Sequence, residues 1–423
     1  MRFKPLVILG AFDKSDSAWS WKSITRSSTS WLVALLAVLW ILIYQYCRFV
    51  YSRDPTSYFF DGTRGYERRY SLRREQQAYD FIRAANGTST LPIPTQPEPF
   101  MCIGIATVAR ISAQQYVRGT IGSVLHGLTE EERQSIYLMP FIAHTHPSDY
   151  PVYREPWLAA ISNRVLEYEV SDQDRARLQR FEEGHHFRNK SMYDYGYLLE
   201  NCYETGAAWI VMLEDDVLAR AGWYAKTVDA LSRIRRMTSD DGWLYLRMFY
   251  TEGLLGWNSE EWVRYFGWSF ISFMVLLAAL IGARIKSFRL QRNLSNLNMV
   301  VCLIALPAFI ILYFMAGRVS MQLLDAGVHE MSRFGCCSQG FIFPRAIVPR
   351  LIERTRKDMD EDYYVDMLLE RWAGAENLKR FVAVPSMLQH VGAKSSKGWG
   401  YDEGAGTTWN FGFETHPFSR RVT

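Results

Sequence analysis

The 423-residue sequence predicts an α/β protein whose parallel sheet is interrupted by a membrane hairpin. Two observations support this fold class, and a third bears on the partners. From Phe100 onward, short apolar runs typical of buried strands alternate with helical segments. Three uncharged runs are long enough to cross a bilayer, and the last two fall inside the alternating region. The net charge of +4 gives no indication of a nucleic-acid partner.

The first uncharged run extends from Ser27 to Cys47 and is expected to be a membrane anchor. It begins too far from Met1 for a cleaved signal peptide and lacks a small-residue cleavage site. The second run covers residues 265–283 and the third covers residues 297–315. Together they predict a transmembrane hairpin, since a membrane helix can absorb the proline that the third run contains.

The loop between the second and third runs predicts the orientation. It contains no acidic residue and four basic ones: Arg284, Lys286, Arg289 and Arg292. Basic loops stay in the cytosol, so both flanking segments are expected on the lumenal side. Five arginines that follow the first span favour the opposite orientation, but a tight hairpin must return to its starting side. Glycosylation sequons at Asn86 and Asn189 are then lumenal, and the one at Asn293 is cytosolic.

These signals divide the chain into six parts. We expect a cytosolic tail (1–30), a transmembrane anchor (31–50), a lumenal stem (51–98), a first catalytic half (99–260), a transmembrane hairpin (264–316, with a cytosolic loop at 284–296) and a second half (317–423).

Each half contains predicted strands and helices. In the stem, a helix is expected from Ser71, as its cap, to Ala85, followed by a proline-rich connector. The first half has expected strands at 101–108, 135–143, 209–213 and 243–250, and helices at 114–128, 158–181 and 193–205. The second half has an expected turn and strand at 335–343, a helix at 345–356, an acidic loop leading into a helix over 358–372, and a short strand at 381–385. Neither half has enough strands for a stable core, so the two halves are expected to fold together.

The strongest chemical signal is the acidic sequence Glu214-Asp215-Asp216, directly after a predicted buried strand. Ligands of such sheets bind beyond the carboxyl ends of the strands. Glu214 and Asp216 alternate to the same side of an extended chain, so one can serve a nucleotide and the other a divalent cation. The alternative interpretation is an acidic turn that caps the next helix.

Two further segments supply candidate ligands. Thr107 and Arg110 close the first predicted strand, where they can bond the base and phosphates of a nucleotide; an ordinary turn is the alternative. His390 lies far along the chain and is a candidate metal ligand from the second half. A histidine satisfied within the core is the alternative.

Four motifs in sequence order carry a resemblance to known enzymes. They are Gly104-Ile-Ala-Thr-Val-Ala-Arg110, Tyr193-Asp194-Tyr-Gly-Tyr-Leu-Leu199, Leu213-Glu-Asp-Asp-Val217, and Gln389-His-Val-Gly392 with Ser395-Ser396 close behind. The order resembles the N-glycan branching N-acetylglucosaminyltransferases and the Golgi N-acetylgalactosaminyltransferase that adds a side chain to glycosylphosphatidylinositol (GPI) anchors. The second family fits better, because it also has an N-terminal span and a transmembrane hairpin inserted in the catalytic domain.

This resemblance implies a GT-A (Rossmann-like) fold and an inverting transfer of N-acetylgalactosamine (GalNAc) to a mannose of the GPI glycan. It implies a UDP-sugar donor, UDP-GalNAc, and Mn²⁺ or Mg²⁺ as the cation. Asp216 and His390 are expected to contact the metal, with Glu214, Asp215 and Asp194 at the nucleotide. GPI-anchored proteins are the expected acceptors, at a multi-pass Golgi membrane with the catalytic domain in the lumen.

Inversion needs a carboxylate base on the face opposite the leaving UDP. Asp366 is chosen because the related branching enzymes carry an acid ahead of a leucine pair at the corresponding place. Glu361 and Asp362 are the reserves. An acidic helix start favoured by the helix dipole is the alternative explanation for all three.

Two other functions remain open on the sequence alone. One is an N-glycan branching N-acetylglucosaminyltransferase, and the other is a non-catalytic membrane receptor or escort on a transferase fold. Four cysteines outside the apolar runs can pair in an oxidising lumen: Cys102, Cys202, Cys336 and Cys337. The sequence does not give their connectivity, and buried free thiols are the alternative for the first two.

Overall fold

The structure is a computed structural model that describes residues 28–87, 98–110, 115–286, 295–331, 337–361, 363–392 and 408–415. The expected proline-rich connector, most of the hairpin loop and Asp362 lie outside these residues. The chain forms two compact units. One comprises Met1–Val50 and Asn258–Met315, and the other comprises Tyr51–Trp257 and Ala316–Thr423.

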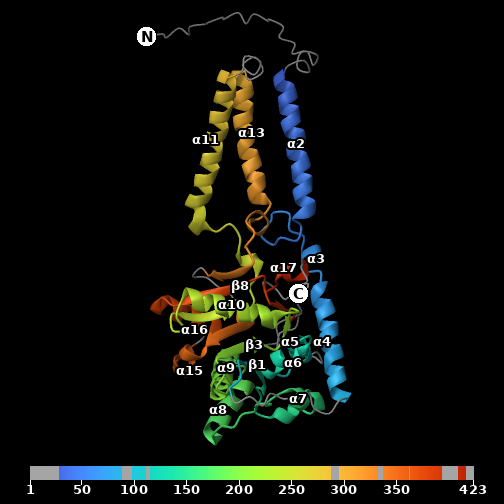
Figure 1. Cartoon of the computed structure of the whole chain (residues 1–423), viewed down its shortest axis with the longest axis vertical. Helices are drawn as coiled ribbons and strands as arrows, with labels where there is room; N and C mark the ends of the chain where they lie inside the picture. Colours follow the sequence, from blue (N-terminus) through green and yellow to red (C-terminus); the bar gives the residue numbers. More distant parts are fainter. Residues whose placement is uncertain are drawn as a thin grey trace, which may run out of the picture. The chain divides into compact units, whose positions relative to one another are not determined.

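The first unit contains three apolar helices of membrane-spanning length, as predicted (Figure 1). They are α2 (Ser28–Val50), α11 (Trp262–Lys286) and α13 (Asn296–Met315). Polar side chains link the first and third of these helices. Thr29 Oγ1 donates to Asn298 Oδ1 at 2.6 Å, and Trp40 Nε1 donates to the carbonyl of Ala308 at 3.1 Å. Such bonds hold helices together where no water competes for the polar groups.

The second unit is built on a seven-stranded sheet in the order β2-β1-β3-β7-β5-β8-β6. The strands are β1 (Met101–Thr107), β2 (Ile136–Ile142), β3 (Trp209–Glu214), β5 (Trp243–Arg247), β6 (Gly327–Glu330), β7 (Gly340–Pro344) and β8 (Lys379–Val384). A separate two-stranded ribbon pairs β4 (Val217–Ala219) with β9 (Leu388–His390). β7 lies between β3 and β5, so strands from both sides of the hairpin interleave. The expectation that the two halves fold together is confirmed.

The sheet is mixed and not parallel throughout. β1, β2 and β3 run parallel, as do β5 and β8, whereas β7 and β6 are antiparallel to their neighbours. The parallel strands are joined through helices, as the alternating pattern predicts. β6 and β7 instead follow the return of the chain from the membrane hairpin, without a crossover helix to fix their direction.

Helices cover both faces of the sheet (Figure 1). On one face lie α4 (Tyr70–Gly87), α5 (Val117–Leu125), α7 (Pro156–Ile161) and α10 (Trp223–Met237). On the other lie α8 (Asp172–Glu183), α9 (Phe187–Glu204), α15 (Val348–Lys357) and α16 (Val365–Glu376). Short helices complete the unit: α3 (Gly62–Gly65), α6 (Glu130–Gln134), α14 (Arg318–Met321), α17 (Phe411–Thr415), and the 3₁₀ turns η1 (Pro147–Asp149), η2 (Glu252–Leu254) and η4 (Arg345–Ile347). A further 3₁₀ turn, η3 (Ser259–Glu261), belongs to the first unit and precedes α11. A Cys102–Cys202 disulfide joins β1 to α9 and settles one pairing that the sequence left open.

Two helix predictions need correction. The helix expected over residues 158–181 is two helices, α7 and α8. They are separated because Leu166 forms a bridge to Phe141 at the edge of the sheet and Ser171 caps a new helix. Ser71 does not cap its helix, because α4 already begins at Tyr70.

The start of α4 is capped from a distant part of the chain. The backbone N–H groups of Arg69 and Ser71 donate to the carboxylate of Glu414, at 2.8 and 3.1 Å. Arg74, one turn further, is buried and donates to the carbonyls of Ala219 and Ser123. The segment expected as a stem therefore packs as part of the second unit.

One predicted glycosylation sequon is engaged within the fold. The side-chain amide of Asn189 lies in the first turn of α9 and donates to the carbonyl of Met359 at 2.9 Å. A glycan on this nitrogen would remove that bond, which argues against the modification expected there. Asn86 lies in the last turn of α4.

Candidate functional site

The acidic sequence lies where β3 leaves the sheet. Glu214 is the last residue of β3, Asp215 and Asp216 form a turn, and β4 begins at Val217. The ribbon of β4 and β9 pairs Val217 with His390. This pairing brings a histidine from the second half next to Asp216. The turn, and not the strand alternation expected from the sequence, sets the directions of the carboxylates.

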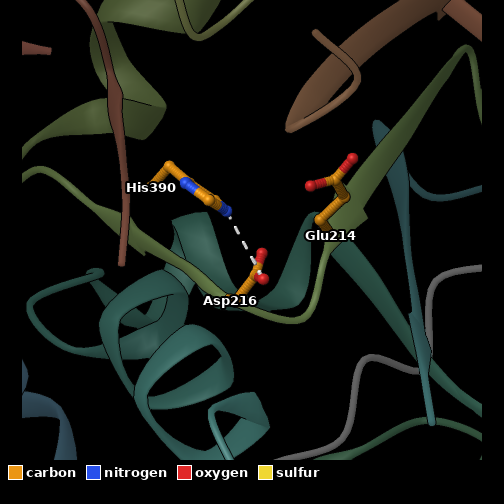
Figure 2. A group of neighbouring side chains, drawn as sticks. All are labelled: Glu214, Asp216 and His390. Carbon is orange, nitrogen blue, oxygen red and sulfur yellow. Dashed lines mark ion pairs between the residues drawn. The ribbon is translucent and has the colours of Figure 1, made fainter. Parts of the chain in front are cut away.

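Glu214, Asp216 and His390 form one cluster, in which one ligand atom from each side chain lies within 4.8 Å of the others. His390 Nε2 points at Asp216 Oδ2 from 3.4 Å, and the two side chains are 12% and 14% exposed (Figure 2). The second carboxylate oxygen of Asp216, Oδ1, is buried and has no hydrogen-bond partner in the described part of the chain. An orphaned buried carboxylate oxygen beside an imidazole and a second carboxylate fits a divalent cation.

The electrostatics of the cluster favour a negatively charged Asp216 beside a positively charged His390. Burial alone raises the pKa of Asp216, but the facing His390 and Arg110 outweigh it and hold that pKa below its ordinary value. Burial opposes protonation of His390, but Asp216 raises its pKa above the ordinary value. A divalent cation between the two side chains would replace the proton on His390 and satisfy the same carboxylate.

Asp215, Thr107 and Arg110 form a separate buried network beneath the cluster. Arg110 donates to both carboxylate oxygens of Asp215, each at 2.7 Å, and Thr107 Oγ1 donates to Asp215 Oδ2 at 2.6 Å. The side chains of Arg110 and Asp215 are only 4% and 7% exposed. Arg110 also reaches Asp216 Oδ2, at 3.1 Å. The structure therefore brings these three predicted ligands together, but it commits Asp215 to protein partners.

The segment that leads into β7 holds Glu214 from the other side. Ser338 Oγ donates to Glu214 Oε1, and the Glu214 N–H donates to the carbonyl of Gln339 at 3.2 Å. Cys337 precedes them with a φ of +94°, a left-handed conformation that is uncommon for a residue with a side chain. Ser338 was not singled out from the sequence, because no spacing signal connects it to the acidic residues.

A C-terminal segment, residues 408–415, supports His390 and was also missed. Thr408 Oγ1 lies 2.8 Å from His390 Nδ1, the ring nitrogen that faces away from Asp216. Gln389 exchanges two bonds of 2.9 Å with the backbone of Asn410, and its amide also donates to Glu414. These contacts fix β9 and the orientation of the imidazole. No sequence motif indicates these contacts.

Glu252 holds the same C-terminal segment at the start of α17. Its buried carboxylate accepts from the backbone N–H groups of Phe411 and Gly412, at 2.9 and 2.8 Å. Burial raises the pKa of Glu252 to about 7, although the two N–H donors favour the charged form. Asp54 also faces this carboxylate and raises its pKa further.

Asp194 lies in a different buried network, on α9. Lys190 Nζ donates to its Oδ2 at 2.9 Å, and the Tyr168 hydroxyl donates to its Oδ1. Lys190 also donates to the carbonyl of Ala143, at the end of β2. Asp194 therefore orders the same edge of the sheet but is not part of the Glu214 cluster.

The predicted base candidates lie around the start of α16. Asp366 is in its first turn and is partly exposed, and its Oδ1 accepts from the N–H of Met367. Glu361 is exposed before the helix, and Asp362 lies outside the described residues. Of the two that the structure describes, neither Asp366 nor Glu361 joins the cation cluster. One turn later, Glu370 accepts from Arg247 and Arg380, at 3.2 and 2.5 Å.

Arg247 connects α16 to the site. It is fully buried, and its Nη1 donates to the carbonyl of Cys337 at 2.8 Å, next to the serine that holds Glu214. A chain of polar contacts thus runs from the cluster to α16. Residues of the second half therefore surround and hold the acidic turn of the first half.

Fold and site together define a membrane protein whose α/β unit carries a carboxylate–histidine cluster where the central strands end. The family model of the GPI-N-acetylgalactosamine transferase PGAP4 matches residues 101–389, from the first residue of β1 to the residue before His390. The match covers more than half of the chain, so the chain belongs to this family and is a glycosyltransferase. The resemblance drawn from the sequence motifs is confirmed. A search of curated proteins gives no match.

Proposed function

We propose that this protein is an inverting, cation-dependent glycosyltransferase that transfers GalNAc from UDP-GalNAc to a mannose of the GPI glycan. The family supplies the reaction class, and the cluster of Glu214, Asp216 and His390 is the observation that supports its cation dependence. The seven-stranded sheet with helices on both faces supports a GT-A-like arrangement. We place the enzyme in the Golgi membrane, with the loop at 284–296 in the cytosol and the second unit in the lumen.

In this proposal Asp216 and His390 hold Mn²⁺ or Mg²⁺. Such an ion neutralises the charge that develops on a departing diphosphate. Glu214 lies on the same side and is assigned to the nucleotide. Asp215 is assigned a positioning role together with Thr107 and Arg110, because its oxygens are already bonded. Asp194 is assigned to ordering the edge of the sheet beside the donor.

The acceptor hydroxyl must lose its proton to a carboxylate on the face opposite UDP. We assign this role to Asp366, which is partly exposed and bonded only to an adjacent backbone N–H among the described residues. Glu370 is a poorer candidate, since its carboxylate oxygens already accept hydrogen bonds from Arg247 and Arg380. Asp366→Asn should keep donor affinity and lose transfer by a factor on the order of 100. Normal turnover in Asp366→Asn, with Glu361→Gln or Asp362→Asn inactive, would move the role to that neighbour.

The decisive experiment is a panel of UDP-sugars offered to the purified full-length protein with Mn²⁺, with Mg²⁺ or with chelator. We expect UDP-GalNAc to bind and react only with a cation, and Asp216→Asn to lose both binding and transfer. Transfer from UDP-N-acetylglucosamine to a soluble N-glycan would favour the branching-enzyme alternative. Failure of every UDP-sugar to bind would favour the receptor alternative, and full activity in chelator would remove the cation from the proposal.

A further inference from the structure

The three chain segments that join the second unit to the membrane helices meet at one place on that unit. Asp54, after α2, accepts from the backbone N–H and hydroxyl of Ser320, after α13, at 2.8 and 2.6 Å. Arg318 Nη1 donates to the carbonyl of Gly256, before α11, at 3.2 Å. The N–H of Val319 donates to Thr56 Oγ1 at 3.2 Å. We call residues 54–58, 254–256 and 317–324 the connection surface.

Close packing fixes this arrangement. Gly317 has a φ of +96°, and a Cβ there would lie 2.5 Å from Asp54 Oδ2 and 2.8 Å from the N–H nitrogen of Ser57. A side chain at this position is therefore excluded by backbone conformation and by contact. Gly256 lies against the methyl group of Thr56. The connection surface is a built element of the unit and not three independent linkers.

The connection surface lies at the same edge of the sheet as the candidate site. Strands β1, β3, β5 and β8 share one direction, and Glu214 ends β3 at their carboxyl edge. The segment containing Gly256 leaves from that edge, because it follows the end of β5. β6 is antiparallel and pairs Gly327 with Val384, the last residue of β8, so the chain after Ser320 also arrives there.

Exposed apolar side chains concentrate on this surface. In the described part of the second unit, eight large apolar side chains are exposed, and four of them belong to the connection surface: Tyr58 (73%), Leu254 (58%), Leu323 (79%) and Leu324 (47%). The other four are scattered over α4, α9, α10 and α16. A concentration of apolar side chains on a soluble unit marks an interaction surface.

We propose that the connection surface lies in the headgroup region of the bilayer, with Tyr58, Leu254, Leu323 and Leu324 inserted among the lipids. The partner is a lipid surface, because all three segments continue directly into helices of membrane-spanning length. Tyrosine is suited to this depth because its ring is apolar and its hydroxyl is polar. The leucines are wholly apolar and insert into the boundary between headgroups and acyl chains. The candidate site then opens close to the membrane.

The placement has a consequence for the choice of acceptor, and this consequence rests on the proposed function. A glycan attached to a lipid anchor presents its mannoses close to the membrane surface. A site at the membrane-facing edge reaches them without extraction of the anchor. Free soluble glycans lose this advantage, so we expect selectivity for acceptors that are anchored in the same bilayer.

The test uses full-length protein in phosphatidylcholine nanodiscs, with Cys47 and Cys302 replaced by alanine and a nitroxide label placed on one introduced cysteine. Leu254→Cys and Leu323→Cys report on the surface, and Met237→Cys, exposed on α10, is the matched control. Power-saturation electron paramagnetic resonance should show labels 254 and 323 relaxed more by oxygen than by a water-soluble nickel chelate. Label 237 should show the reverse. The proposal would be overturned if labels 254 and 323 were as accessible to the nickel chelate as label 237, or if they were shielded from both oxygen and nickel.

A second measurement separates this inference from the proposed chemistry. Replacing Leu254, Leu323 and Leu324 together by serine should reduce transfer to a lipid-anchored acceptor about tenfold or more, while transfer to the same glycan without lipid is unchanged. Equal rates for the two acceptors in wild-type protein and in the variant would refute the role of the surface. The label depths do not depend on catalysis, so they stand even if the donor or the reaction is wrongly assigned.

Discussion

Replacing Asp215 by alanine should destabilise the protein much more than replacing Asp216, although the two residues are neighbours. Asp215 neutralises Arg110 through two bonds of 2.7 Å in a place where both side chains are almost completely buried. Asp215→Ala leaves that guanidinium buried without its main partner. Asp216→Ala leaves the Arg110–Asp215 pair intact and removes only a partly exposed carboxylate.

The two costs follow from the contacts. Breaking a buried ion pair by removing one partner costs about 3–5 kcal/mol. Loss of the Asp216 contact costs about 1 kcal/mol, because His390, unlike Arg110, can become neutral and keeps Thr408 as a partner. For a unit of this size, the first loss lowers the melting midpoint by roughly 5–15 °C and the second by a few degrees. Both variants should be inactive, but only Asp216→Ala should be inactive while well folded.

The assay is thermal unfolding of the detergent-solubilised full-length protein, followed by tryptophan fluorescence, beside cation binding measured by calorimetry. A third variant, Arg110→Met with Asp215→Leu, removes both charges and should recover much of the stability of Asp215→Ala. The reasoning is refuted if Asp215→Ala and Asp216→Ala have equal melting midpoints, or if the double variant is less stable than Asp215→Ala.

Three further predictions concern the supports of the site. Thr408→Val should weaken cation binding about 10- to 100-fold by freeing the His390 ring, whereas Thr408→Ser should bind like wild type; equal dissociation constants by calorimetry would exclude a positioning role. Glu252 binds its proton more tightly in the folded state, where its pKa is about 7 against an ordinary value of 4.5. The free energy of unfolding should therefore fall by up to about 3 kcal/mol as the pH rises from 4.5 through 7. Glu252→Gln should flatten this part of the pH profile measured by denaturant titration, and an unchanged slope would contradict the assignment. Asn86→Gln should remove one glycan on a mobility gel and Asn189→Gln none; the reverse pattern would show that the amide of Asn189 is free when the chain is modified.

Local pattern was enough to predict the elements that carry the chemistry. The apolar sequence before Glu214 predicted β3, the acidic sequence predicted the end of that strand, and the second and third apolar runs predicted α11 and α13. The direction and order of the strands could not be predicted this way. The position of β7, for example, depends on its neighbours β3 and β5 and not on its own sequence. The roles within the acidic sequence were equally hidden: whether Asp215 faces a ligand or an arginine depends on where Arg110 arrives in three dimensions.

The residues that position Glu214 and His390 could not be predicted from the sequence for a related reason. Ser338 and Thr408 are single polar residues without a spacing rule, and each acts only because the fold carries it to Glu214 or His390. Ser71 was expected to cap its helix, but a carboxylate from the C-terminal segment supplies that bond from far along the chain. Contacts of this kind leave no periodic trace in the sequence.

The position of β7 between β3 and β5 has a consequence for biosynthesis. A nascent chain that ends before the hairpin cannot close its sheet, because the strand that belongs beside β3 has not yet been translated. In the proposed lumenal orientation, the first half therefore keeps an unpaired edge beside β3 until the second half has been translated. A hairpin inserted in the opposite orientation would leave β7 on the other side of the membrane, and the sheet could not form. In the proposed topology, closure of the seven-stranded sheet therefore requires that the hairpin has been inserted in the correct orientation.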